Sequence, residues 1–164
     1  MRLTQFTDYA LRTLIYLGSY QDRLVAVAEV ARAYRISYNH LVKVAGLLVD
    51  RGVVESARGR GGGLRLARPP REINVGWVVR QTESDFDLVE CFDEGSDACP
   101  ITPACILKSV LEDARDSFLA SLDRYTLADL LATPHHQQRL VQLWSNASAA
   151  PSADRPAGLT RLQR

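Results

Sequence analysis

Three cysteines, Cys91, Cys99 and Cys105, are the only ones in the 164-residue chain, and all lie in the segment CFDEGSDACPITPAC. Gly, Pro and acidic residues interrupt this segment, so it has no apolar periodicity and cannot form a core helix or strand. This composition argues against three merely buried thiols, and an odd number does not suit a disulfide framework. Thiolates converging from a loop are what zinc or an iron–sulfur cluster requires, with a fourth ligand from elsewhere. Spacing alone leaves both open.

Charge is distributed unevenly along the chain. Residues 1–80 carry 13 Lys+Arg and 6 Asp+Glu, a balance of +7, whereas residues 81–164 have a balance of −6. This asymmetry indicates a nucleic-acid-binding part joined to a sensing or assembly part, with an unevenly charged solvated surface as the alternative. No stretch is long and apolar enough to cross a membrane, and the amphipathic start lacks a secretory cleavage site. We therefore expect a reduced, cytoplasmic setting.

The first predicted helix runs from about residue 4 to residue 20. Helical spacing defines its core face, which consists of Phe6, Ala10, Leu14 and Leu17. Asp8 lies on the far side, near Arg12 and Ile15, where it is free to pair outward or across an interface. The alternative is an ordinary acidic residue in a first turn, favoured by the helix dipole.

Residues 25–52 follow the pattern of a helix-turn-helix. A short helix leads to a turn near Arg35, and a second helix begins at Ser37, a good N-cap residue. Gly52 ends that helix where a left-handed C-cap is commonly needed. The residues that a recognition helix would present to DNA here are Ser37, Tyr38, Asn39, His40 and Lys43. An amphipathic helical hairpin with no DNA partner is the alternative.

The segment VVESARGRGGGLRLA alternates apolar and polar residues on both sides of a glycine-rich tip. It predicts a two-stranded hairpin with Arg58 and Arg60 at its end. A helix-turn-helix followed by a basic hairpin is a winged helix, and an arginine on such a tip can enter the narrow minor groove. A phosphate-binding nucleotide loop is excluded because no Lys-Ser/Thr follows the glycines.

The acidic half is predicted to contain a short helix over about residues 73–83 and then, directly after Cys105, the most regular helix of the chain. Its apolar seam comprises Leu107, Val110, Leu111, Ala114, Phe118 and Leu122. Burial against its copy in a homodimer explains such a seam, with packing on its own N-terminal lobe as the alternative. Thr126 caps a further short helix with Asp129 as reciprocal partner. His135 and His136 are expected on the surface, and a disordered tail from about residue 145.

The segments LTQFTDYALRTLIYL and LLVDRGVVESARGRGGGLRLA, with three cysteines before a long helix, resemble the Rrf-two family of winged-helix repressors over roughly residues 1–132. The cysteine spacing, the stretch WVVRQTESDFDLVECF and Asp8 are most similar to its nitric-oxide-sensing members. The resemblance implies a mainly α fold with a small β-hairpin wing, in which a winged helix-turn-helix is joined to a long dimerisation helix. The expected divisions are a DNA-binding domain (1–80), a cluster-binding loop (81–106), a dimerisation helix with a following short helix (107–132) and the tail (145–164).

The resemblance also implies a ligand set. It suggests a homodimer with one iron–sulfur cluster per subunit, a 4Fe-4S type, held by Cys91, Cys99, Cys105 and Asp8 of the partner subunit. A sister member that regulates cluster biogenesis uses a His three residues after the third cysteine, where this chain has Lys108. Nitric oxide would displace the weakly held Asp8 first.

The expected function is a repressor bound to a pseudo-palindromic double-stranded DNA operator. Nitrosylation of its cluster would release DNA and derepress nitric-oxide detoxification genes. The alternative within the family is a cluster-status or general redox-sensing regulator, followed by a zinc-stabilised or thiol-only sensor. An enzyme is not expected, because the chain has no Ser/His/Asp set and no nucleotide loop.

Overall fold

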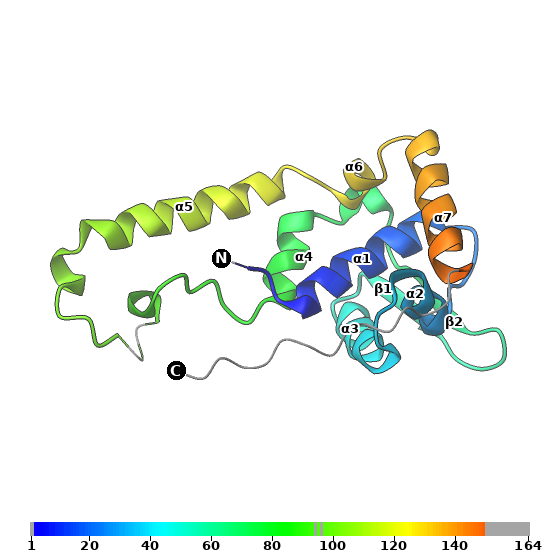
Figure 1. Ribbon diagram of the computed structural model, residues 1–164, viewed down its shortest axis with the longest axis horizontal. Helices are drawn as coiled ribbons and strands as arrows, with labels where there is room; N and C mark the ends of the chain where they lie inside the picture. The colour runs from blue at the N-terminus through cyan, green and yellow to red at the C-terminus, as the bar shows by residue number, and fades with distance from the viewer. Residues whose placement is uncertain (1, 94, 96, 150–164) are drawn as a thin grey trace.

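The computed structural model describes residues 2–93, 95 and 97–149, and Figure 1 traces them from blue to orange. The elements in chain order are α1 (Gln5–Ser19), α2 (Val27–Tyr34), α3 (Tyr38–Asp50), β1 (Val54–Ala57), β2 (Gly63–Leu66), 3-10 helix η1 (Pro70–Glu72), α4 (Val75–Thr82), 3-10 helices η2 (Glu90–Phe92) and η3 (Thr102–Ala104), α5 (Ile106–Asp123), α6 (Leu127–Leu131) and α7 (Pro134–Ala149). The predicted mainly α fold with a β-hairpin is confirmed. None of the described helices is long and apolar enough to span a membrane.

Helix α1 lies at the centre of the body and packs against α3, α4, α6 and β2 (Figure 1). Thr4 begins it by accepting a 3.2 Å hydrogen bond from the Thr7 N–H. Ala10, Leu14 and Leu17 are at most 1% exposed, as their helical spacing predicted. Phe6 is partly buried against the same core. The predicted first helix is therefore confirmed with its face.

Helices α2 and α3 form the predicted helix-turn-helix. Arg35 makes the turn in the left-handed region with φ of 54°, and Gly52 follows α3 with φ of 66°, the conformation that glycine tolerates best. Ser37 occupies the N-cap position, but its side chain makes no capping hydrogen bond. Ser37 is exposed, and its hydroxyl accepts no hydrogen bond from the N–H groups in the first turn of α3.

The predicted wing is an antiparallel pair in which Val54 faces Leu66 and Ala57 faces Gly63. Its β2 strand is joined to the loop before α2, because the Val25 N–H donates to the Leu64 carbonyl at 2.9 Å and the Leu64 N–H donates back at 2.8 Å. The chains approach so closely that a Cβ on Gly63 would lie 2.7 Å from the Val25 carbonyl oxygen. Glycine at this position therefore fixes the wing against the helix-turn-helix.

Helix α5 extends away from the body as a single arm, and the segment before it runs out along the same arm (Figure 1). Its C-terminal end is bound to α4 at what we call the α4–α5 junction, formed by Asn74, Arg80 and Asp123. The Arg80 guanidinium donates to both Asp123 carboxylate oxygens, at 2.6 and 2.7 Å. Asn74 caps α4 through Oδ1 while its Nδ2 donates to the Asp123 carbonyl at 2.7 Å. The capping box of Thr126 and Asp129, predicted from sequence, starts α6 directly after it.

The last helix, α7, differs from the sequence-based expectation. Residues 145–149 belong to it rather than to a disordered tail, and residues 150–164 lie outside the described residues. Trp144 anchors this helix to the body, because its side chain is 6% exposed and its ring centroid lies 4.6 Å from that of Tyr16. His135 and His136 are exposed in the first turn, as predicted.

Candidate nucleic-acid interface and cysteine segment

The exposed face of α3 carries the predicted DNA-binding side chains. Tyr38, Asn39, His40 and Lys43 are all exposed, whereas Leu41, on the opposite face, is buried. The exposed residues also include Val42, which was not among the predicted DNA-binding residues. The imidazole of His40 stacks on the Tyr9 ring of α1, with centroids 6.3 Å apart. The His40 ring is therefore positioned by the body of the protein, while the residue itself stays exposed.

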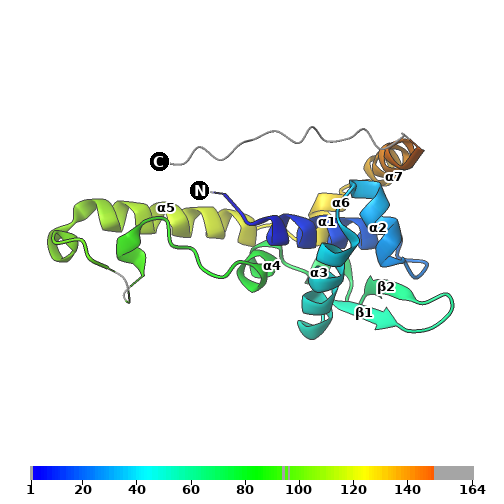
Figure 2. The ribbon, with the colours of Figure 1, turned by 60° about the horizontal axis from the view of Figure 1, so that its bottom comes forward.

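The wing extends on the same side of α1 as α3 does (Figure 2). Arg58 and Arg60 are exposed at its tip, as predicted, and Gly59 and Gly61 between and after them have φ of 96° and 82°. At the wing base, the Arg68 guanidinium donates to the Gly52 carbonyl at 2.9 Å and lies 5.8 Å from the centre of the Trp77 ring. The wing thus has exposed cations at its tip and a hydrogen-bonded one at its base.

A network behind the interface sets the position of α2. The Tyr16 hydroxyl donates to Glu29 at 2.9 Å, and the Arg23 guanidinium donates to the other Glu29 carboxylate oxygen at 3.0 Å. The hydrogen bond from Arg23 is the main reason that the pKa of Glu29 is lowered. Burial, with Glu29 as the second cause, raises the pKa of the Tyr16 hydroxyl, so this hydroxyl stays a donor.

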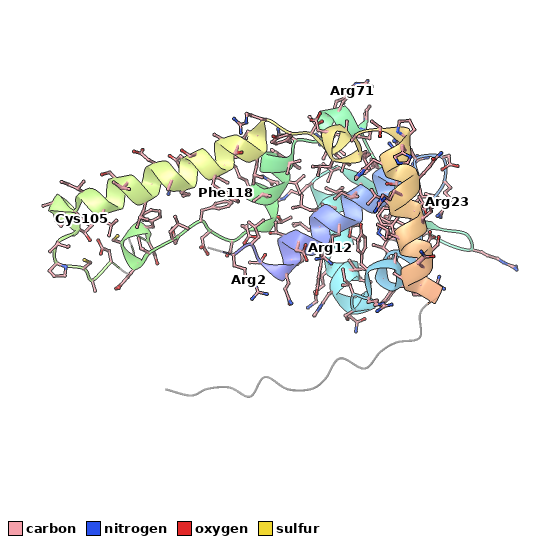
Figure 3. The ribbon with its side chains drawn as sticks, turned by 45° about the horizontal axis from the view of Figure 1, so that its top comes forward. Arg2, Arg12, Arg23, Arg71, Cys105 and Phe118 are labelled. Atoms are coloured by element: carbon pink, nitrogen blue, oxygen red, sulfur yellow. The ribbon has the colours of Figure 1, made fainter. Side chains whose placement is uncertain are left out.

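The three cysteines lie on the segment that runs out beside the α5 arm, and Cys105 marks the far end of the arm (Figure 3). Cys91 is in η2, Cys99 precedes η3, and Cys105 is the residue before α5; each is partly exposed and none forms a disulfide. Asp97 orders the second half of the segment, since its Oδ1 accepts from the Cys99 N–H and from the Thr102 hydroxyl, both at 3.0 Å. The Arg115 guanidinium of α5 lies 5.1 Å from the centre of the Phe92 ring.

Among the described residues, the structure does not bring three metal-ligating side chains together in one group. The donor set nevertheless fits a thiophilic metal or cluster, because the thiols are free, partly exposed and on one segment. Asp8 is far from them: it lies on α1 in the body, four residues from Arg12, while Cys105 marks the opposite end of the arm (Figure 3). Asp8 of one chain therefore cannot join the cysteines of the same chain in this arrangement.

The Asp8 carboxylate is paired with Arg12, whose guanidinium donates to both of its oxygens at 2.8 Å. Both residues line a surface cleft of about 490 Å³ that also includes Arg2 and Arg35. This ion pair was not predicted, although Arg12 follows Asp8 at the i,i+4 spacing of opposite charges that is the usual signal for one. Asp97 was missed as well; its signal was the position two residues before Cys99, typical of a side-chain turn.

A helix-turn-helix whose second helix and following hairpin both expose polar and basic side chains defines a winged-helix DNA-binding protein. Residues 3–133 match the Rrf2 family, described as an iron-dependent transcriptional regulator. The chain belongs to this family, and it is accordingly a transcription regulator rather than an enzyme.

Individual relatives agree with this assignment. The chain is 48% identical to the HTH-type transcriptional regulator NsrR of Halalkalibacterium halodurans and 47% identical to that of Bacillus subtilis, in both cases over 87% of this chain and 99% of the relative. Among solved structures, T. potens IscR superposes with a TM-score of 0.64 at 28% identity, covering 80% of this chain and 86% of the other. The resemblance inferred from the opening helix and the wing is therefore confirmed.

Proposed function

We propose that this regulator is a homodimeric repressor that senses nitric oxide through an iron–sulfur cluster of the 4Fe-4S type, one per subunit. The ligands proposed are Cys91, Cys99 and Cys105 of one subunit and Asp8 of the partner subunit. The observation that carries the proposal is the separation of the segment with the free cysteines, whose Cys105 lies at the far end of the α5 arm, from Asp8 on α1. A fourth ligand from α1 then has to come from a second copy.

The exposed seam of α5 supports the homodimer. Leu107 and Val110 are 62% and 55% exposed, and of the whole helix only Leu119 is buried within the chain. Two such seams packed together would remove this apolar surface from water. Lys108, in the first turn of α5, stands where the alternative ligand set needs a His, so that set is incomplete in this chain.

When bound, a cluster of this kind supplies iron that reacts with nitric oxide. The chain's own residues divide the ligand work unequally, because thiolates bind iron more tenaciously than a carboxylate does. Asp8 is therefore the ligand that exchanges, and the Arg12 guanidinium beside it is a ready partner for the freed carboxylate. Since α1 packs directly on α3, a change at Asp8 is transmitted to the DNA-binding helix.

DNA contact is proposed for Ser37, Tyr38, Asn39, His40 and Lys43 on α3 and for Arg58 and Arg60 on the wing. These residues are exposed, and α3 and the wing extend on one side of α1 (Figure 2). A two-fold dimer places two such surfaces on successive turns of DNA. The operator proposed is accordingly a pseudo-palindrome with half-sites about one helical turn apart.

The test uses full-length protein purified without oxygen. Iron and sulfide content and the visible spectrum are measured first, and gel shifts then compare holo, cluster-free and nitric-oxide-treated protein on a duplex selected by the holo form. We expect Cys99→Ala to lose the cluster and Asp8→Ala to hold it but release it faster. Asp22→Ala is the matched control: it removes an exposed aspartate from a loop outside the proposed ligand set, and it should behave as wild type. Equal DNA affinity of all three forms would refute sensing, and binding of promoters by the cluster-free form would favour a cluster-status regulator.

A further inference from the structure

Four exposed residues of α3 lie on one outward face: Asn39, Val42, Lys43 and Gly46, at the helical spacing i, i+3, i+4, i+7. We call this set the α3 outer stripe. It lies opposite the buried residues of the same helix, among them Val44 and Leu48. The stripe joins an amide, a branched apolar side chain, a cation and a residue with no side chain.

Val42 is an apolar side chain that the fold leaves exposed. It is 44% exposed, while the other valines of the helix are largely or wholly withdrawn from solvent. A single exposed valine on an ordinary surface needs no explanation. Val42, however, stands between Asn39 and Gly46 on the helix that meets DNA, and its β-branched side chain has few rotamers to lose on contact.

Gly46 leaves the stripe open on the next turn. A Cβ built at this position meets no heavy atom within 4 Å, so packing inside the protein does not require a glycine here. Glycine inside a helix costs about 0.5–1 kcal/mol relative to alanine. Its presence on the outer face instead lowers the helix surface beside Val42, which lets another molecule approach the helix backbone closely.

The chemistry of the stripe matches one edge of a base pair. In the major groove an A·T pair presents the adenine N7 and N6, which an Asn amide pairs with in bidentate fashion, and the thymine 5-methyl group, which apolar side chains contact. The exposed cations Lys43, Arg58 and Arg60 provide attraction for the flanking phosphates. The stripe contains no Arg to pair with guanine and no acid to accept from cytosine.

We propose that Val42 is a specificity-determining residue that packs on a thymine 5-methyl group in each operator half-site, next to an adenine read by Asn39. Gly46, which has no side chain, lets the edge of the groove come close to the helix. The inference rests on the proposed role of α3 as the recognition helix. The contact involves neither the cluster nor the signal directly, but it is tested in the cluster-bound form, which is the form proposed to bind DNA. An operator half-site read in this way must contain an A·T step under the middle of α3.

The experiment isolates one methyl group at a time. A duplex is selected from a random-sequence library with wild-type holo protein purified without oxygen, and each thymine is then replaced by deoxyuridine, which removes only the 5-methyl group. Fluorescence anisotropy gives Kd for every duplex with wild type and with Val42→Ala. We expect one thymine per half-site whose replacement weakens wild-type binding about fourfold, the worth of one buried methyl group. Val42→Ala should bind the unmodified duplex more weakly and be insensitive to the same replacement.

Matched variants complete the test. Val42→Thr keeps one methyl and the branched shape, so it should retain part of the sensitivity to deoxyuridine, and Leu143→Ala, an exposed residue on α7, should leave the profile unchanged. Circular dichroism verifies that each variant is folded. Equal deoxyuridine profiles for wild type and Val42→Ala would overturn the proposal while leaving α3 as the recognition helix. Failure of folded wild-type protein to enrich any sequence would overturn both.

Discussion

Replacing Trp144 by alanine should detach α7 from the body. The Trp144 ring is 6% exposed, and its centroid lies 4.6 Å from that of Tyr16 and 5.6 Å from that of Tyr34. Through this ring α7 holds a residue of α1 and a residue of α2 together. One further bond, from the Arg35 guanidinium to the Ala147 carbonyl at 3.2 Å, joins the end of α7 to the turn before α3.

The expected size of the effect follows from this burial. Truncating a fully buried Trp or Phe costs about 3–5 kcal/mol, of which aromatic pairing supplies about 0.5–1.5 kcal/mol per pair. Helix α7 lies at the edge of the body, so it can move into the space that the ring leaves. We therefore expect the free energy of unfolding to fall by about 3 kcal/mol, at the lower end of that range.

Urea unfolding followed by far-ultraviolet circular dichroism measures this loss, and limited trypsin digestion at Arg139 reports locally on α7. The matched control is Leu143→Ala, next to Trp144 but 54% exposed, which should change stability by no more than about 0.5 kcal/mol. Cleavage at Arg139 should accelerate for Trp144→Ala alone. A loss below about 1 kcal/mol, with unchanged cleavage, would show that the ring does not hold the helix.

Three further perturbations test other parts of the molecule. Gly52→Ala forces alanine into φ of 66° and should lower stability by about 1–2 kcal/mol, seen as a lower Tm; an unchanged Tm would contradict the cap. Because Arg23 lowers the pKa of Glu29, the unfolded state takes up a proton at a higher pH than the folded state does. The free energy of unfolding should therefore fall as the pH drops from about 4.3 through the lowered pKa. Urea titrations at several pH values should show this loss for wild type and not for Glu29→Gln. If the proposed homodimer forms through α5, Val110→Glu should give monomers in sedimentation, whereas Asp113→Glu should not; a Val110→Glu protein that sediments as wild type would contradict the α5 interface.

Much of the fold could be predicted because its signals are local. Ala10, Leu14 and Leu17 recur at helical spacing, and the glycines of the wing and Gly52 occupy positions where backbone conformation alone restricts the residue. The capping box of Thr126 and Asp129 is likewise a pattern of four residues. In each case the residues that determine the structure are neighbours along the chain.

Features that depend on distant partners were missed. Helix α7 carries Gln137, Gln138 and Gln142 and looks polar; Trp144 becomes a core residue only because tyrosines from α1 and α2 converge on it. Ser37 occupies the predicted N-cap position, but its side chain makes no capping hydrogen bond, because residue type does not determine the orientation of a hydroxyl. The cysteine segment follows the same rule: residue types predict its chemistry, whereas the arrangement of its ligands depends on contacts beyond the segment.

Because the α4–α5 junction holds only one end of α5, a small rotation there corresponds to a large displacement at the other end. Helix α5 has 18 residues and is therefore about 27 Å long, with Arg80 and Asn74 binding one end and Cys105 at the other. For a rod of this length, a rotation of about 10° at the gripped end corresponds to a shift of about 5 Å at the free end. A displacement of a few ångströms at the cysteine end of α5 therefore reaches α4 as a small rotation at the α4–α5 junction.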